Sequence, residues 1–203
     1  MSMAKRIITI GRQCGSGGHR VGEIIAGKLG IPFYDREIIS MVAQRSGFCG
    51  EFVEKNGEKV PDSAVFSCAA GTFYGCPVTV PPSADPSLQV CACQADLIRE
   101  LAARGPCVIV GRGADYILQD RSDCLNVFFH AAMDYRIRFI TGELGISEPE
   151  AVKYIREKDK NRSRYYSRIT GQEWGNAKHY HLCIDAGAFS MELCADMIIK
   201  CLD

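Results

Sequence analysis

The sequence predicts an α/β fold, a three-layer sandwich in which helices cover both faces of a five-stranded parallel sheet. Five short apolar runs are continuous rather than alternating, as expected of strands that are buried on both faces. These runs lie at residues 6–10, 31–34, 107–110, 125–130 and 182–184. Segments with helical periodicity separate them, and this alternation favours parallel strands joined by right-handed crossovers.

The helices are marked by apolar residues three and four positions apart. The first such stripe follows the first strand and is closed by Gly30. A second stripe, over 97–102, is stopped by the Gly-Pro pair that comes soon after it. Residues 147–150, Ser-Glu-Pro-Glu, have the spacing of a capping box and place a proline in the first turn. A last stripe after Ser190 predicts a C-terminal helix.

One stretch, residues 51–93, lacks sustained periodicity and carries five of the eight prolines and four of the eleven cysteines. We expect an irregular insertion there, within a single domain that spans residues 1–203. Its four cysteines could be read as a metal site, but they lack the paired C-x2-C spacing of structural zinc, which favours unpaired thiols. These cysteines are Cys68, Cys76, Cys91 and Cys93.

Composition and charge argue against several classes of function. Lys plus Arg and Asp plus Glu both number 24, so the formal net charge is zero and a generally basic nucleic-acid binder is disfavoured. No run approaches the length of a membrane span, and the first apolar stretch is too short for a signal peptide. The number of cysteines is odd, which argues against a disulfide scaffold. Many of them lie in apolar segments, which indicates buried free thiols in a reducing cytoplasm. Examples are Cys107, Cys183, Cys194 and Cys201.

The segment between the first strand and the first helix, residues 11–19, is rich in glycine. Its sequence, Gly-Arg-Gln-Cys-Gly-Ser-Gly-Gly-His, lets the backbone curl so that several N–H groups point at one phosphate, and the helix N-terminus adds its dipole. The Walker pattern G-x4-G-K-[ST] is not met, because Gly18 stands where the lysine should be. Two alternatives remain open. One is a dinucleotide site, for which Asp35, about twenty residues further on, would be the acidic residue. The other is a purely structural turn.

Arginines recur just after the strands, where ligands bind in open α/β sheets. Arg112, between two glycines, follows the third run, and Arg136 follows the fourth. The densest charge run, 153–168, has seven basic residues against Glu157 and Asp159, a local charge of +5. In isolation this run is typical of a solvated helix face. Combined with a phosphate-shaped loop, the arginines favour a site that clamps several phosphates.

Several segments together resemble the bacterial cytidylate kinase-like family, a branch of the P-loop nucleoside monophosphate kinases. The segments are ITIGRQCGSGGHRVGEIIAGKLGIPFYDREII, GRGADYIL, DYRIRF, REKDKNRSRYYSRITGQEW and HLCIDA. The resemblance covers residues 4–48 and 94–203 and implies a kinase-like domain with a phosphate loop. It also implies an acceptor-nucleotide lobe over 51–93, a mobile helical lid over 147–175, the cofactors ATP and Mg²⁺, and small-molecule nucleotides as partners.

On the donor side, the resemblance implies that the loop wraps the phosphates of the donor nucleotide. The residues involved would be Gly15, Ser16, Gly17, Gly18 and His19. Because the lysine is absent, the positive charge must come from His19, from Arg12 or Arg20, or from arginines of the lid. Ser16 is the candidate contact for magnesium.

On the acceptor side, Arg112 matches the arginine of a Gly-Arg-Asp motif that grips the acceptor phosphate in this family. The motif reads Gly-Arg-Gly here, with Asp115 two places late. Asp35 and Arg136 are further candidate substrate contacts, and Asp185 matches the aspartate that ends the last strand.

The lid motif is matched by Arg156, Asp159 and Arg162, which with His19 are the candidate catalytic residues. Six positions separate the two arginines, so a straight helix would point them about 120° apart. We therefore expect the helix to bend or end between them, with Asp159 orienting both guanidinium groups.

These observations favour an ATP- and magnesium-dependent kinase of a small phosphorylated acceptor, most simply a pyrimidine nucleoside monophosphate such as CMP. The alternative is a non-catalytic nucleotide-binding or regulatory protein that keeps the phosphate pocket. The missing lysine favours this alternative, and the arginine clusters oppose it. The oligomeric state is left open by the sequence.

Overall fold

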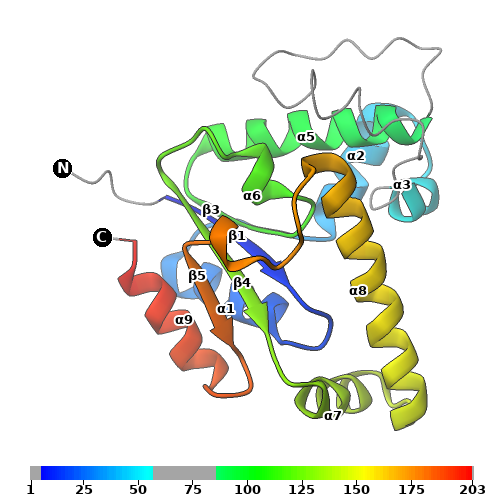
Figure 1. Ribbon diagram of the computed structural model, residues 1–203. Helices are drawn as coiled ribbons and strands as arrows, with labels where there is room; N and C mark the ends of the chain where they lie inside the picture. Colours follow the sequence, from blue (N-terminus) through cyan, green and yellow to red (C-terminus); the bar gives the residue numbers. More distant parts are fainter. Residues whose placement is uncertain (1–5, 57–85, 203) are drawn as a thin grey trace.

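A single parallel sheet forms the centre of the computed structural model, which describes residues 6–56 and 86–202 (Figure 1). Its strands are β1 (Ile7–Arg12), β2 (Phe33–Tyr34), β3 (Cys107–Val110), β4 (Cys124–His130) and β5 (Leu182–Asp185). They lie in the order β2-β3-β1-β4-β5, and every neighbouring pair is parallel. The prediction of a five-stranded parallel sheet is confirmed.

Helices cover both faces of this sheet, which makes the three predicted layers. One face is covered by α1 (Gly18–Leu29) and α9 (Met191–Lys200), and Ile8 and Ile10 of β1 are buried there. Ile7 of the same strand is buried on the other face. The helices there are α2 (Glu37–Ser46), α3 (Gly50–Asn56), α5 (Pro86–Arg104) and α6 (Ala114–Ile117). Alternate residues of β1 thus enter two apolar cores, which explains the continuous apolar runs.

Two further helices lie at the end of the sheet to which the strands point, α7 (Met133–Leu144) and the long α8 (Glu148–Thr170) (Figure 1). The expected helix boundaries are confirmed. Gly30 ends α1 with a left-handed φ of 64°, and Ser147 forms a capping box with Glu150 at the start of α8. At the start of α9, the Ser190 hydroxyl accepts a hydrogen bond from the N–H of Leu193.

The prediction of an irregular segment over 51–93 is wrong at both of its ends. Residues 51–56 belong to α3, and residues 86–93 are the first two turns of α5, including Cys91 and Cys93. Proline starts this helix, where the missing N–H costs nothing, so its presence does not argue against a helix. Residues 57–85, with Cys68 and Cys76, lie outside the described residues.

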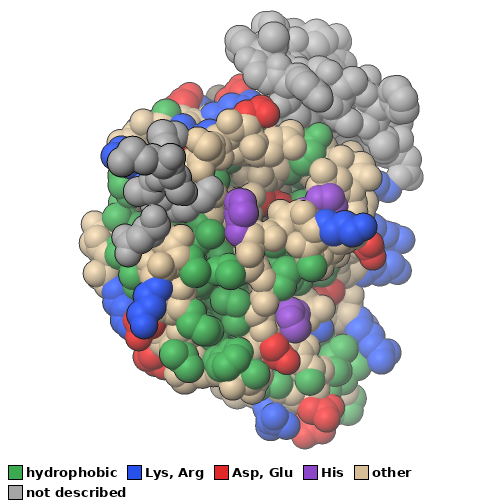
Figure 2. Space-filling view, turned by 60° about the vertical axis from the view of Figure 1, so that its left-hand side comes forward, with side chains coloured by type: hydrophobic (Ala, Val, Ile, Leu, Met, Phe, Trp, Pro, Cys, Tyr) green, Lys and Arg blue, Asp and Glu red, His purple; other side chains and the backbone are tan. Residues whose placement is uncertain are grey.

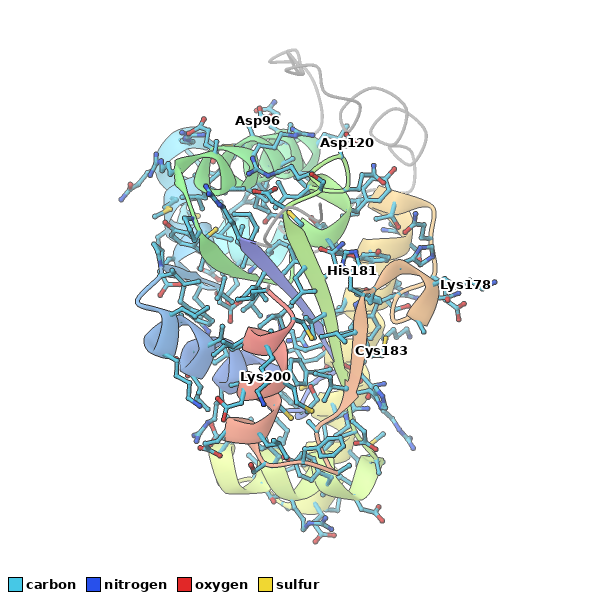
Figure 3. The ribbon with its side chains drawn as sticks, turned by 90° about the vertical axis from the view of Figure 1, so that its left-hand side faces the viewer. Asp96, Asp120, Lys178, His181, Cys183 and Lys200 are labelled. Atoms are coloured by element: carbon cyan, nitrogen blue, oxygen red, sulfur yellow. The ribbon has the colours of Figure 1, made fainter. Side chains whose placement is uncertain are left out.

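The nine cysteines in the described residues are free thiols. Cys107 and Cys194 are buried as expected, but the same expectation is wrong for Cys183 and Cys201, which are exposed. Cys183 lies on β5, the edge strand (Figure 3). On the same side of the molecule, hydrophobic side chains gather in the middle of one face, with charged groups towards its margins (Figure 2). Among the described residues, no helix is both long and apolar enough to cross a membrane.

Candidate active site

The glycine-rich loop between β1 and α1 has the backbone shape that the sequence predicts. Gly15 and Gly17 have φ angles of 79° and 78°, in the left-handed region that favours glycine. A Cβ atom at Gly15 would lie 2.8 Å from the carbonyl oxygen of Arg136, so the loop packs closely on α7. The first N–H groups of α1 have no partner within the helix, and they attract an anion. The loop therefore fits the phosphates of a nucleotide.

Arg136 supports the backbone of this loop through a hydrogen bond and an ion pair. Its side chain is 5% exposed, its Nε donates to the carbonyl oxygen of Cys14 over 2.7 Å, and its guanidinium group pairs with Asp159. The other carboxylate oxygen of Asp159 accepts the N–H of Cys14, also over 2.7 Å. These bonds engage Arg136 within the protein, which does not support its expected role as a substrate contact. Together, Arg136 and Asp159 hold the backbone of the loop between α7 and α8.

The expectations for the lid helix need three corrections. α8 is one unbroken helix, with no end between Arg156 and Arg162. Arg156 is exposed, whereas Arg162 is partly buried and donates from Nη1 to the carbonyl oxygen of Arg12 over 3.2 Å. Asp159 does not orient both arginines, because it is engaged by Arg136 and Cys14. Of the two lid arginines, the helix brings only Arg162 to the site.

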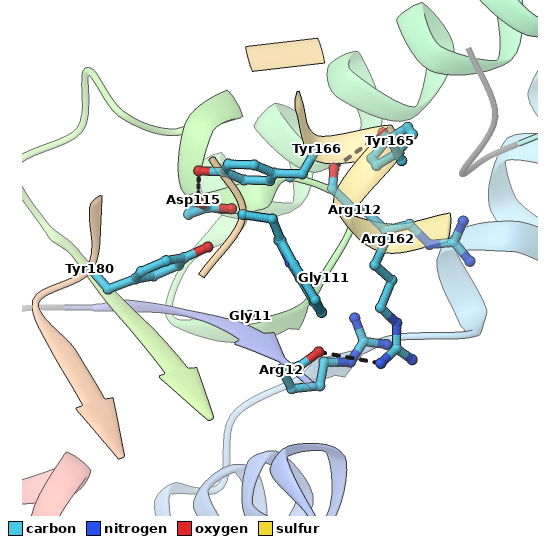
Figure 4. Close-up of a pocket in the computed structure, with 11 residues that line it drawn as sticks. Gly11, Arg12, Gly111, Arg112, Asp115, Arg162, Tyr165, Tyr166 and Tyr180 are labelled. Atoms are coloured by element: carbon cyan, nitrogen blue, oxygen red, sulfur yellow. Dashed lines mark hydrogen bonds between the residues drawn. The ribbon is translucent and has the colours of Figure 1, made fainter. Parts of the chain in front are cut away.

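A pocket lies at the carboxyl ends of β1 and β3, beneath α8 (Figure 4). Three arginines line it, Arg12, Arg112 and Arg162, each from a different segment of the chain. Four aromatic side chains complete the wall, namely Tyr165, Tyr166, Trp174 and Tyr180. Nη1 of Arg112 and Nε of Arg162 are buried without a hydrogen-bond partner among the described residues. A buried unpaired donor costs about 1–3 kcal/mol, so these groups favour a bound anion. We call this cavity the arginine pocket.

The turn that carries Arg112 has an uncommon conformation. Gly111, Arg112 and Gly113 have φ angles of 74°, 59° and 66°, three left-handed residues in succession. The φ of Gly111 favours glycine, and a Cβ there would also displace the end of the Arg12 side chain, whose Nη1 would lie 1.9 Å from it. Arg112 is the one non-glycine residue with positive φ in the described part of the chain, and such strain is characteristic of functional sites. Its carbonyl oxygen accepts a hydrogen bond from the Tyr165 hydroxyl over 3.4 Å.

The carboxyl group that lines the arginine pocket belongs to Asp115. Asp115 is buried, and the Tyr166 hydroxyl donates to its Oδ2 over 2.7 Å. Burial raises the pKa of Asp115 and outweighs the opposite effect of this hydrogen bond and of the backbone donors. Burial likewise raises the pKa of Tyr166 and of Tyr180, so both hydroxyls stay protonated. Three arginines line the pocket beside this carboxyl group, so positive charge predominates among its lining residues.

Asp35, at the end of β2, is held by two cations. Its Oδ1 lies 3.3 Å from Nη2 of Arg12, and its Oδ2 lies 2.6 Å from Nδ1 of His19. Burial would raise the pKa of Asp35, but the hydrogen bond to His19 and the charge of Arg12 together hold it below its usual value. The hydrogen bond to Asp35 raises the pKa of His19, against a smaller opposing effect of burial. Asp35 and His19 lie beside the loop and do not line the arginine pocket. Their pairing balances the charges of Asp35, Arg12 and His19.

This pairing predicts how stability depends on pH. A raised pKa of His19 contributes stability that is fully present below its ordinary value of 6.5 and lost as pH rises through the raised pKa. A lowered pKa of Asp35 contributes stability that is lost as pH falls below 3.8. We expect the unfolding free energy of the native chain to exceed that of His19→Gln most between these two pH values. Urea unfolding from pH 3 to 9 measures the difference, and a constant difference over that range would contradict it.

The candidate magnesium contact does not fit. Ser16 is fully buried, and its hydroxyl donates to the carbonyl oxygen of Gln13 over 2.9 Å. No group of three or more His, Cys, Asp or Glu side chains within residues 6–56 and 86–202 is arranged to hold a metal ion. Arg20, a further candidate for the phosphates, pairs with Glu143 on the surface. The residues present therefore provide a phosphate loop without a metal-holding hydroxyl.

A second cavity, of about 540 Å³, lies near the carboxyl ends of β4 and β5, bordered in part by Gln13 of the loop. Its walls include Phe128, His130, Trp174 and Asp185. Trp174 also lines the arginine pocket, so one indole side chain borders both cavities. A volume of this size suits a nucleoside. We call this the β5 cavity.

The sequence reasoning missed the aromatic part of the site. Tyr165 and Tyr166 follow Arg162 by one turn of α8, and their position within the basic run was the signal that could have located them. Nothing local in the sequence marks Trp174 or Tyr180, because the loop that carries them is brought to the pocket by the fold.

A glycine-rich loop between the first strand of a parallel sheet and the helix that follows, with arginines beside it, is the arrangement of a phosphate-binding α/β protein. The chain matches the cytidylate kinase-like family over residues 7–188, and it belongs to this family. The curated proteins contain no match to the chain.

Solved structures share the fold. An uncharacterized protein from Eubacterium ventriosum is 26% identical, with a TM-score of 0.73, 98% of this chain and 99% of the other being covered. The shikimate kinase from Bacteroides thetaiotaomicron is 16% identical, with a TM-score of 0.55 and 97% of each chain covered. A gluconokinase from Sinorhizobium meliloti is 15% identical, with a TM-score of 0.53, and 98% of this chain and 93% of the other are covered. The family and the fold support a nucleotide-using phosphotransferase.

Proposed function

We propose that this protein transfers the terminal phosphoryl group of ATP to a small phosphorylated acceptor, a pyrimidine nucleoside monophosphate such as CMP. The arginine pocket carries this proposal, because three arginines line it and two of them, Arg112 and Arg162, have buried nitrogens without a partner among the described residues. An acceptor phosphate would satisfy these donors with charge-assisted hydrogen bonds.

Each part of the site has a role in this reaction. The glycine loop holds the donor phosphates through backbone N–H groups, and the β5 cavity receives the donor nucleoside. Arg112 grips the phosphate of the acceptor. Arg162, which contacts the backbone of Arg12 at the boundary of loop and pocket, is placed to meet the negative charge of the phosphoryl group during transfer. ATP supplies that phosphoryl group, and the protein supplies position and charge.

The proposal is tested by measuring ADP release with a panel of acceptors. The panel contains the common nucleoside monophosphates, their nucleosides, and small hydroxy acids such as shikimate and gluconate. We expect turnover with a pyrimidine nucleoside monophosphate and none with the matching nucleoside, because the arginine pocket requires a phosphate. Turnover with a hydroxy acid alone would contradict the nucleotide acceptor.

One feature favours a second candidate, a nucleotide-binding protein without turnover. Gly18 stands at the lysine position of the phosphate loop, so the loop itself provides no cation there. In that case calorimetry would detect nucleotide binding while no acceptor of the panel supports ADP release.

Removal of the Arg112 side chain should weaken acceptor binding without lowering the stability of the protein. Arg112→Gly removes the guanidinium group and also relieves the left-handed strain at this position. We expect CMP to bind about tenfold to a hundredfold more weakly, with little change in ATP affinity. The variant should be at least as stable as the native chain, with a gain of up to about 1 kcal/mol.

Calorimetric titration and urea unfolding measure the two effects. Arg138→Gly, which removes an exposed arginine in α7, is the control for loss of charge. A variant of Arg112 that keeps CMP affinity, or loses ATP affinity instead, would contradict the assignment of Arg112 to the acceptor.

A further inference from the structure

The position of His19 in the loop bears on how the donor phosphates are neutralised. When Gly18 is matched to the lysine of G-x4-G-K-[ST], His19 takes the next position, that of the serine or threonine. In P-loop proteins the hydroxyl at this position contacts Mg²⁺. Here an imidazole replaces that hydroxyl, and the nearby Ser16 hydroxyl is buried and bonded to Gln13.

The carboxylate nearest to this position is also committed to cations. Asp35 uses one oxygen for Arg12 and the other for His19, at 3.3 Å and 2.6 Å. Its side chain is 10% exposed, so little of it is open to a further ligand. A divalent ion at Asp35 would have to displace one cation and would be repelled by the other.

Two further carboxylates beside the loop, those of Glu23 and Asp159, also have cationic partners. Glu23 lies 3.4 Å from Nε2 of His19, one turn further along α1. Asp159 pairs with Arg136 and accepts the N–H of Cys14. Asp35, Glu23 and Asp159 therefore each have a cationic partner, and none is free to serve as a metal ligand without losing it.

The surroundings of His19 place a carboxylate beside each of its ring nitrogens. Asp35 and Glu23 face its two nitrogens, Arg12 approaches Asp35 from the other side, and the ring of Phe33 packs edge-on at 5.3 Å. Its side chain is 43% exposed, so it remains accessible to a ligand at the start of α1. The hydrogen bond to Asp35 raises the pKa of His19, which favours the charged imidazole near neutral pH.

We propose that Arg12 and His19 take the place of a protein-held magnesium ion, so that this loop binds the nucleoside polyphosphate directly in its metal-free form. The proposal rests on the proposed function only in that the glycine loop binds a nucleoside polyphosphate. It concerns the cation that neutralises the phosphates, and it is independent of the identity of the acceptor.

Calorimetric titration with ATP tests this in two buffers, one with excess Mg²⁺ and one with EDTA. We expect ATP to bind the native protein in EDTA at least as tightly as in Mg²⁺, because a metal ion would compete with the fixed cations for the phosphates. Binding that is tenfold or more tighter with Mg²⁺ would overturn this proposal and leave the proposed function intact. No binding in either buffer would overturn both.

His19→Ser restores the hydroxyl of the Walker pattern and removes the cation. We expect its affinity for ATP in EDTA to fall about tenfold to a hundredfold, and Mg²⁺ to restore most of the loss. Lys28→Gln is the matched control, because it removes a cation at the other end of α1 that pairs with Asp196. It should bind ATP like the native chain. A His19→Ser variant that binds as tightly as the native protein in EDTA would overturn the proposal.

Discussion

Replacing Arg162 by alanine is expected to lower kcat about a hundredfold or more, while the KM for ATP changes by less than about threefold. Arg162 reaches the site through its bond to the Arg12 carbonyl oxygen, and its Nε is buried without a partner among the described residues. An arginine in this place stabilises the transition state more than the ground state, because negative charge develops on the migrating phosphoryl group during transfer. Its loss therefore lowers kcat.

Arg156→Ala provides a matched control for this experiment. It removes the same charge from the same helix, but its side chain is exposed and away from the pocket. We expect its kcat to stay within about twofold of the native value. Steady-state ADP release measures both variants. If both lower kcat equally, the effect comes from the general charge of α8 and not from the position of Arg162.

Replacing Arg136 by leucine is expected to lower the free energy of unfolding by about 3–5 kcal/mol. The side chain is buried, and its removal leaves the Cys14 carbonyl oxygen and the Asp159 carboxylate without their donor. Because the loop loses its support, ATP affinity should also fall.

Arg138→Leu, two positions along α7 and exposed, should change stability by no more than about 0.5 kcal/mol. Urea unfolding of both variants measures this difference. A double-mutant cycle with Asp159→Asn then separates the Arg136–Asp159 interaction from simple packing. A small effect of Arg136→Leu would mean that the loop keeps its shape without this arginine.

The sheet and its flanking helices could be predicted from the sequence, because their signals are local. A strand covered on both faces is apolar at every position, and helix ends carry their own capping residues, as at Ser147 and Gly30. The error at 86–93 has a local cause as well, since proline and cysteine in the first turns of α5 resemble loop composition.

The distribution of roles among the arginines could not be predicted in the same way. Arg136 and Arg138 lie two positions apart and look alike in the sequence, yet one is buried beneath the loop and the other faces solvent. Which side of α8 faces the loop is decided by contacts with Cys14 and Arg12, more than 140 residues away in the chain. The spacing of Arg156 and Arg162 predicts the angle between them on a helix, but it does not predict which face of α8 packs against the loop.

Trp174 is the one tryptophan in the sequence, and it borders both cavities with its ring edge-on to Phe128 at 5.4 Å. The tryptophan emission of this protein therefore arises from a single indole that borders both the arginine pocket and the β5 cavity. A molecule that enters either cavity changes the polarity around that indole, and so alters the wavelength or intensity of its fluorescence. The protein thus carries a built-in optical reporter, with which the order of addition of two substrates can be followed without a label.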